Sequence, residues 1–350
     1  AGAAVAHALA VRGVAVSVVE RADAPAHGAS GNPRGVFRPL LSRDDNRASR
    51  LTRAAFLHDL RAWASLDGVR WARSGVLHLA KDSDTAAKQQ RALQALQPPP
   101  EFARWVELDE ARALANWPVE APGVWYPQGG WIEPASLVRA WLAHPAITLH
   151  TGRAVSRLMP AANGWRLAGL DGGVLAEADA VVVANACDVG ALLPASAWPL
   201  HAVRGQVTRL PMGCLPEISR VIAREGYVAP GAEPLVGATY EHDDLDVAPR
   251  VASDRANLAR LESILPGAAG RVDPDAVVGR AALRATLPDR LPLVGAVSGL
   301  PGVYVAAGYA SRGLVWAGLL GEALADRMTG EPVPLEIELI RAISPQRFAR

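Results

Sequence analysis

The chain has 350 residues, half of them apolar and a fifth charged, and its formal net charge is +1. This length supports two domains or one large composite unit, while the near-neutral charge gives no argument for nucleic-acid binding. Apolar stretches are too short to span a membrane, and residues 1–12 lack the pattern of a signal peptide. Cys187 and Cys214 belong to no CxxC or Cys/His cluster, so we expect no metal site and no disulfide framework, in a cytoplasmic protein.

The first predicted elements are a helix at 3–12, which Gly13 ends, and a buried strand at 14–19. They correspond to the second half of a dinucleotide-binding βαβ unit. Gly2 fits the third glycine of the GxGxxG fingerprint, and Glu20 fits the acid that binds the ribose. The first strand and first two glycines would lie before residue 1, so we expect a Rossmann-type α/β domain with its first strand truncated. This segment alone is equally consistent with any α/β helix–strand pair.

Three later segments have the composition of a dinucleotide site. Small residues in the loop at 28–39 let backbone amides approach a ligand. A buried strand at 178–186 ends in small residues, where an open α/β sheet binds its ligand. A strand at 302–307 leads through the glycine-rich turn 308–313 into a helix at 314–327, whose first turn offers free amides and a positive dipole end. The predicted cofactor contacts, together with Gly2 and Glu20, are Ala29, Ser30, Gly31, Asn32, Gly35, Val155, Ala184, Asn185, Ala186, Gly308, Ser311, Arg312, Gly313 and Leu314.

Four stretches carry a more specific resemblance: ASGNPRGVFRPLLS at 29–42, QGGWIEPASL at 128–137, RATLPDRLPLVG at 284–295 and GYASRGLVWA at 308–317. In this order they resemble the D-amino-acid oxidase superfamily, and within it the FAD domain of the bifunctional proteins of tRNA 5-methylaminomethyl-2-thiouridine biosynthesis. The tail at 331–350 also resembles that group. The resemblance implies FAD as cofactor, tRNA as substrate and, in the native protein, a fused N-terminal methyltransferase domain that residues 1–350 lack. We expect non-covalent FAD, because no cysteine or histidine stands in a recognised attachment motif.

Members of this superfamily pass twice between two domains. We therefore expect an FAD-binding domain from 1–56, 135–200 and 281–350, and a discontinuous substrate domain from 57–134 and 201–280. The substrate segments alternate polar and apolar residues, which is typical of half-buried antiparallel strands. The prediction is a mostly antiparallel sheet that roofs the flavin and forms the substrate pocket.

Arg284 is the main candidate in the pocket, because its segment resembles the glycine-oxidase stretch in which an arginine binds the substrate carboxylate. A guanidinium presents two parallel donors that match a carboxylate. The alternative is a structural pair between Arg284 and Asp289. Tyr309 and Arg312, from the glycine-rich turn, are the other predicted catalytic residues.

Side chains of the predicted roof strands are further candidates. The aromatic residues can stack on a uracil ring, although packing is the more common role of such residues, and for the histidines we favour surface or structural roles. These residues are Trp125, Tyr126, Trp131, Tyr227 and Tyr240, and the histidines are His201 and His242.

A run of arginines follows the glycine-rich loop. Six of them lie between residues 34 and 53, against Asp44 and Asp45. Arg43, Arg47 and Arg50 repeat at helical spacing, which predicts one helical face that grips phosphates. A solvated charged face is the alternative interpretation.

The function that these observations favour is FAD-dependent oxidation of 5-carboxymethylaminomethyl-(2-thio)uridine at the wobble position of tRNA. The products are 5-aminomethyl-(2-thio)uridine and glyoxylate. An oxidase of free glycine-like amino acids would share the fold and Arg284 but needs no tRNA surface. A non-catalytic flavoprotein remnant is the third interpretation.

Overall fold

The structure is a computed structural model that describes residues 1–193 and 198–348. The first lobe is built around parallel strands. Helix α1 (Gly2–Val11) is followed by Gly13 in a left-handed conformation, φ +80°, which turns the chain into β1 (Val16–Val19). Strand β1 runs parallel to β8 (Ile147–His150). These elements confirm the helix, glycine turn and strand predicted at the start of the chain.

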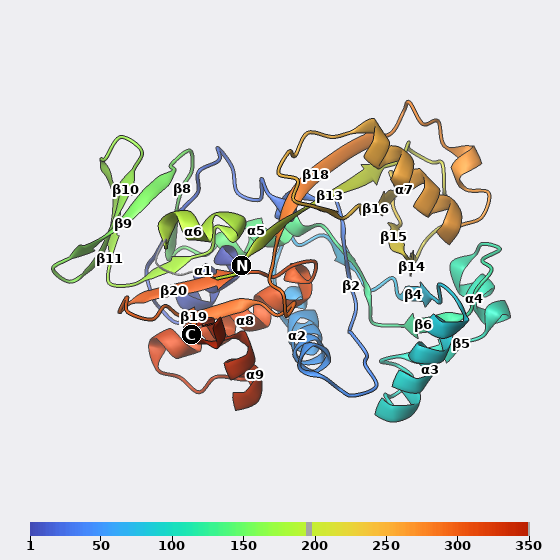
Figure 1. The fold of residues 1–350 in the computed structure, drawn as a ribbon, viewed down its shortest axis with the longest axis horizontal. Helices are drawn as coiled ribbons and strands as arrows, with labels where there is room; N and C mark the ends of the chain where they lie inside the picture. Colours follow the sequence, from blue (N-terminus) through green and yellow to red (C-terminus); the bar gives the residue numbers. More distant parts are fainter. Residues whose placement is uncertain (194–197, 349–350) are drawn as a thin grey trace.

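A second group of strands completes this lobe. Strand β12 (Val181–Val183) runs parallel to β20 (Val303–Ala307), and β19 (Leu293–Ala296) adds to β20 in the antiparallel sense. The parallel strands therefore form two separate pieces, β1–β8 and β12–β20–β19. Three further strands, β9 (Val155–Ala161), β10 (Gly164–Gly169) and β11 (Val174–Ala178), form an antiparallel sheet that projects from the lobe (Figure 1).

Helices pack closely in the same lobe. Helix α8 (Gly313–Thr329) packs on both α1 and α2 (Arg47–Ala64). A Cβ atom at Gly321 would lie only 2.8 Å from the backbone carbonyl carbon of Ala4, so α1 and α8 meet backbone to backbone. Helix α5 (Pro134–Leu142) packs on α1, and α9 (Ile337–Ile343) packs on α2. Trp316 and Trp63 are fully buried in this core.

The second lobe is the predicted roof, a nine-stranded sheet whose pairs are antiparallel except β14–β4. Helix α7 (Val251–Ile264) packs on it, while α3 (Ser83–Leu96) and α4 (Leu108–Ala115) lie at its far end (Figure 1). The strands are, in order across the sheet, β17 (Glu241–His242), β13 (His201–Arg209), β16 (Leu235–Gly237), β15 (Gly226–Ala229), β14 (Val221–Arg224), β4 (Val76–Leu79), β6 (Gly123–Tyr126) and β5 (Arg104–Val106), with β18 (Val278–Thr286) paired to β13.

A small sheet lies between the lobes. Strand β7 (Gly130–Ile132) pairs with both β2 (Gly35–Phe37) and β3 (Trp71–Ala72). The glycine-rich loop ahead of β2 is thereby held against a segment of the roof. No helix of the described chain is long and apolar enough to cross a membrane.

Two of the expected domain boundaries fall inside continuous elements. The boundary at 56/57 would cut α2, which is one helix from its Asn46 cap, whose side chain accepts from Ser49 N at 3.1 Å, to Ala64. The boundary at 280/281 would cut β18, which pairs with β13 residue for residue. We therefore propose that α2 belongs wholly to the cofactor lobe and β18 wholly to the roof.

Candidate functional site

One end of the cofactor lobe gathers the residues predicted to bind the dinucleotide. A Cβ atom at Gly2 would lie 3.2 Å from the Cβ of Ala184, so the start of α1 approaches the end of β12 closely. This is the helix–strand contact that the third glycine of the fingerprint permits. Beyond Ala184, the side-chain oxygen of Asn185 is buried without a hydrogen-bond partner, and Ala186 adopts a left-handed conformation, φ +55°. An unpaired buried acceptor at a strand end is available to a ligand hydroxyl.

Glu20 lies beside these residues. Its backbone N–H donates to His150 O at 2.8 Å, and its carbonyl accepts from Arg153 N at 2.9 Å, two residues before Val155 begins β9. Arg21 pairs with Asp188 at 2.6 Å, which ties this strand end to the segment after Ala186. Gly2, Glu20, Val155 and the strand end at 184–186 therefore converge from three distant parts of the chain.

The loop at 28–32 is held by a residue that the sequence did not single out. Arg280 of β18 donates from Nη1 to Asn32 Oδ1 at 2.5 Å and from Nη2 to the carbonyls of His27 and Gly28 at 2.9 and 2.7 Å. Gly31 leaves the space that the Arg280 guanidinium fills. Burial lowers the pKa of Arg280. The roof therefore clamps the short helical turn Ala29–Gly31, and the amide oxygen of Asn32, a predicted cofactor contact, is engaged by Arg280.

The glycine-rich turn at 308–313 connects the cofactor lobe to the roof. Gly308 adopts φ +70° and Ala310 φ +49°, and the Ala310 N–H donates to Ala285 O at 2.9 Å. At the end of the turn, Leu314 packs against Gly35 of β2, and a Cβ atom at Gly35 would lie 2.0 Å from Leu314 Cδ1, so the leucine side chain would have to shift. The turn, the loop and β18 therefore meet at one place, next to Arg284.

Arg284 does not form the structural pair that was the alternative to a substrate role. Asp289 pairs instead with Arg347, at 2.7 Å. The Arg284 Nη1 donates to Thr239 O at 3.3 Å, and the guanidinium carbon lies 4.5 Å from the centre of the Tyr240 ring. No acidic side chain of the described residues pairs with Arg284, so its charge is available to an anion.

Two further roof residues define the surroundings of Arg284. Gly205 of β13 leaves the space that the guanidinium occupies. Burial raises the pKa of the neighbouring Tyr227 to about 12, although the positive charge of Arg284 opposes this shift. The Tyr227 phenol is therefore protonated at neutral pH and able to donate a hydrogen bond beside Arg284.

Other arginines add positive charge to this region. Arg312, which caps the start of α8, is half-buried. Burial lowers its pKa, and the charges of Arg38 and Arg290 lower it further. Arg38 lies 5.3 Å from the centre of the Tyr126 ring. Across the described chain, none of these three arginines forms an ion pair with an acidic residue. The resulting excess of positive charge favours anions and disfavours a second cation. Arg38 lies in the stretch 29–42, and the family resemblance of this stretch could have identified Arg38 as a site residue.

Tyr309, one of the predicted catalytic residues, stands in the glycine-rich turn at 308–313. Its side chain is buried in the core shared with α2 and α8, and its hydroxyl is without a hydrogen-bond partner. Burial raises the pKa of Tyr309, and the nearby carboxylate of Asp59 raises it further. The phenol is therefore a neutral donor that faces α2.

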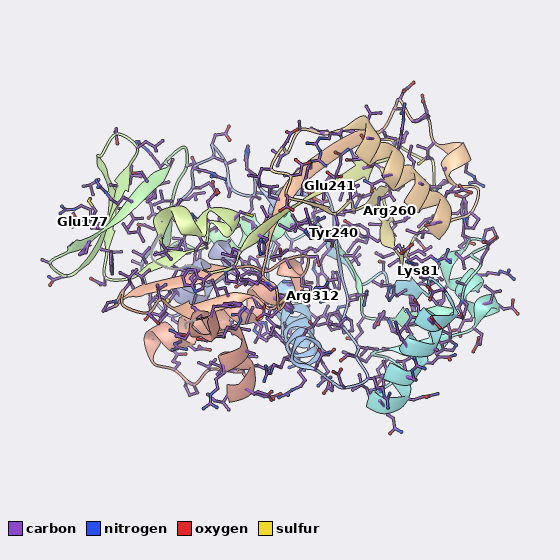
Figure 2. All side chains as sticks on the ribbon, in the orientation of Figure 1. Lys81, Glu177, Tyr240, Glu241, Arg260 and Arg312 are labelled. Carbon is purple, nitrogen blue, oxygen red and sulfur yellow. The ribbon has the colours of Figure 1, made fainter. Side chains whose placement is uncertain are left out.

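The aromatic candidates of the roof differ sharply in exposure. Trp125 and Tyr126 are buried and Trp131 is half-buried, whereas Tyr240 is 56% exposed. Figure 2 shows Tyr240 and Arg312 where the two lobes meet. His201 and His242 are exposed strand residues, as favoured from the sequence.

The predicted helical face of three arginines is wrong in its geometry. Helix α2 begins at Arg47, so Arg43 lies before the helix. Arg47 and Arg50 both pair with Glu338 of α9, at 3.0 and 2.9 Å, and Arg50 also pairs with Glu336. These acids lie almost 300 residues further along the chain, out of reach of any local pattern. The described residues contain no group of three or more His, Cys, Asp or Glu side chains arranged to hold a metal.

Curated relatives match this chain over its whole length. The tRNA 5-methylaminomethyl-2-thiouridine biosynthesis bifunctional protein MnmC of Thiobacillus denitrificans is 68% identical over 100% of the chain, and the protein of the same name from Aromatoleum aromaticum is 45% identical over 99%. The chain spans 58% of the length of each of these relatives.

Solved structures share the fold. Glycine oxidase from Geobacillus kaustophilus superposes with a TM-score of 0.83 at 21% identity, with 100% of this chain and 96% of that one covered. L-proline dehydrogenase from P. horikoshii gives a TM-score of 0.81 at 18% identity, with 99% of this chain and 94% of that one covered. These similarities confirm the α/β fold with a mixed and antiparallel second lobe.

The arrangement fits a bound dinucleotide. The close contact of Gly2 with Ala184 and the unpaired oxygen of Asn185 lie where such a fold places its cofactor. The sequence profile described as FAD dependent oxidoreductase matches residues 1–327. The chain therefore belongs to the family of FAD-dependent oxidoreductases.

Proposed function

We propose that this chain oxidises the carboxymethylaminomethyl side chain of 5-carboxymethylaminomethyl-(2-thio)uridine at the wobble position of tRNA. The observation that carries the proposal is Arg284, a guanidinium with no acidic partner, which lies beside the protonated Tyr227 at the meeting point of the two lobes. The names of the 68% and 45% identical relatives support tRNA as the substrate class.

The residues that would hold FAD come from both lobes. Gly2, Glu20 and Val155 would contact the adenosine end, together with the strand end at 184–186. The loop at 29–35 and the turn at 308–314 would contact the flavin end. We propose non-covalent binding, since neither cysteine lies in the Ala29–Gly31 loop or the 308–314 turn.

Bound FAD supplies the two-electron acceptor for oxidation of the C–N bond to an imine, whose hydrolysis by one water gives 5-aminomethyl-(2-thio)uridine and glyoxylate. The substrate is an N-substituted glycine, so its carboxylate matches the Arg284 fork, and the Tyr227 hydroxyl can donate to the same group.

The positive surroundings also act on the substrate amine. Arg38, Arg290 and Arg312 disfavour an additional cation, so the pKa of a secondary amine bound near them falls. The neutral amine is the form that loses hydride from its carbon. The site therefore needs no general base to produce the reactive form, since the proton leaves to water as the amine enters.

For the native protein we propose a cytoplasmic location and a fused methyltransferase domain outside residues 1–350. The support is that the two relatives are named bifunctional proteins, and that this chain matches 58% of the length of each.

The test is substrate choice by the FAD-loaded full-length protein. Anaerobic bleaching of the flavin and release of glyoxylate are expected with tRNA that carries the carboxymethylaminomethyl group. Slow or no bleaching is expected with glycine and N-methylglycine. Rapid reduction by N-methylglycine together with none by the modified tRNA would assign the chain to the free amino-acid oxidases instead.

A further inference from the structure

Tyr240 differs from every other aromatic side chain of the described residues in being exposed. It is 56% exposed, whereas each Phe, Trp and other Tyr side chain that the structure describes is buried or half-buried. One face of its ring is covered by the Arg284 guanidinium, 4.5 Å from the ring centre. Because Tyr240 is 56% exposed, the rest of the ring is open to solvent. Figure 2 shows the residue at the junction of the lobes. Exposed aromatic rings of this kind are the platforms on which proteins stack nucleobases.

The backbone on both sides of Tyr240 is fixed. Thr239 N donates to Gln206 O at 3.0 Å, and Gln206 N donates to Thr239 Oγ1 at 2.9 Å. On the other side, Glu241 begins β17 and pairs in register with Arg204 of β13. The ring therefore projects from a segment hydrogen-bonded to the roof sheet.

A buried arginine holds the segment that follows. Arg204 is fully buried, and all its guanidinium N–H groups have acceptors. It donates to the carbonyls of Asp246 and Ala248 at 2.6 and 2.7 Å, and to Glu241 Oε2 at 2.5 Å. The remaining acceptors are Gln206 Oε1 at 2.9 Å and Ser253 Oγ at 3.3 Å. Because this network orders residues 241–250 before any ligand binds, a ring stacked on Tyr240 would cost little ordering entropy.

We propose that Tyr240 is the specificity residue that stacks on the nucleobase of the substrate, while Arg284 binds its carboxylate. The inference rests on the proposed function and names the substrate class of that site more closely: an N-substituted glycine whose nitrogen carries a planar ring through one methylene. Four single bonds separate such a ring from the carboxylate carbon, a reach of about 5 Å. One molecule can therefore contact both Arg284 and the neighbouring Tyr240 ring.

The test compares Tyr240→Leu and Tyr240→Phe in the FAD-loaded full-length protein. Leucine has similar size but no π face, and phenylalanine keeps the ring. The ligands are the free 5-carboxymethylaminomethyluridine nucleoside, N-benzylglycine and N-methylglycine, with dissociation constants from equilibrium dialysis and from perturbation of the flavin spectrum. Tyr240→Leu is expected to weaken the binding of the nucleoside and of N-benzylglycine by about 5- to 150-fold. N-methylglycine should change by less than about twofold, and Tyr240→Phe should behave like the parent for all three ligands.

His242→Ala, on strand β17 directly after Tyr240, is the matched control and should change none of these constants. Equal weakening of all three ligands by Tyr240→Leu would overturn the inference, because Tyr240 would then act only through Arg284. Unchanged binding of both ring-bearing ligands would also overturn it. If the proposed function is wrong, the parent protein would bind N-benzylglycine but neither the nucleoside nor the modified tRNA. The effect of Tyr240→Leu on N-benzylglycine binding would still decide whether Tyr240 stacks on a ring.

Discussion

Arg284 has the contacts expected of a carboxylate-binding residue. Its guanidinium is held by Thr239 O and the Tyr240 ring rather than by an acid, and Gly205 provides its space. The structure thus leaves both parallel N–H donors without a charged partner. A carboxylate that docks there exchanges water for a charge-assisted pair of hydrogen bonds.

We therefore predict that Arg284→Leu weakens carboxylate-bearing substrates by about 2–5 kcal/mol, because the substrate anion would lose its partner in a partly desolvated site. Flavin content and melting temperature should stay close to the parent values, since Arg284 forms no ion pair with the fold. The measurement is kcat/KM together with the flavin absorbance ratio. A variant with the kcat/KM of the parent would rule out the carboxylate assignment.

At the scale of elements, helices α2 and α8 meet at a buried charge. Asp59 is fully buried and accepts from the backbone N–H groups of Gly318 and Leu319 at 3.2 and 3.0 Å, and from His58 at 2.7 Å. Burial raises the pKa of Asp59 to about 6, although His58 opposes the shift. The pKa of His58 is also raised, because Asp59 outweighs the effect of burial.

This junction should make stability depend on pH. The folded state holds the Asp59 proton more tightly than the unfolded chain, so the associated stability is present below about pH 4 and is lost as the pH rises to about 6. His58 contributes to stability with the same sign, because its pKa is also raised in the folded state. This contribution is lost as the pH rises above the ordinary pKa of histidine. Asp59→Asn should flatten the fall in the free energy of unfolding between pH 4.5 and 7 by an amount on the order of 2–3 kcal/mol. The measurement is the melting temperature of both proteins across this pH range. Parallel pH profiles for the variant and the parent would contradict this prediction.

The arginines after the glycine-rich loop give a second test at this scale. Arg47 already pairs with Glu338 of α9, whereas Arg43 is exposed ahead of the helix and pairs with no acid of the described residues. If this surface contacts tRNA, Arg43→Gln should reduce the slope of log affinity against log salt by about 0.7–0.9, the loss of one phosphate contact. Arg47→Gln is the matched control and should leave the slope unchanged. Equal slopes for Arg43→Gln and the parent would move the tRNA surface elsewhere.

Sequence patterns within a short window correctly predicted the elements whose formation depends on neighbouring residues. The helix–Gly13–strand unit at the start and the glycine-rich turn that leads into α8 depend on periodicity and on glycine conformation, and both are present. The clamp from Arg280 to Asn32 spans 248 residues, and the pairing of Arg47 with Glu338 spans 291. Such contacts exist only once the lobes have assembled, so no window of sequence reveals them.

At the scale of the whole molecule, the parallel strands form two pieces, β1–β8 and β12–β20–β19. The fingerprint expected ahead of Gly2 includes a strand and two glycines that cradle the pyrophosphate. We predict that residues 1–350 alone bind FAD weakly, whereas a longer protein that adds a strand and two glycines ahead of Gly2 is yellow and releases its FAD on acid denaturation. A stoichiometric flavin spectrum from residues 1–350, or flavin retained in the acid precipitate of the longer protein, would contradict one or the other half of this prediction.

The hydrogen bond from Ala310 N to Ala285 O joins the cofactor turn to the residue next to Arg284 through main-chain atoms alone. In the proposed site, the spacing between the oxidising centre and the carboxylate-binding arginine is therefore independent of the side chains that surround it. Substitutions at exposed positions such as Tyr240 can change which molecules are accepted without disturbing that spacing. A scaffold of this kind permits selection to exchange substrates by small steps while the chemistry stays constant.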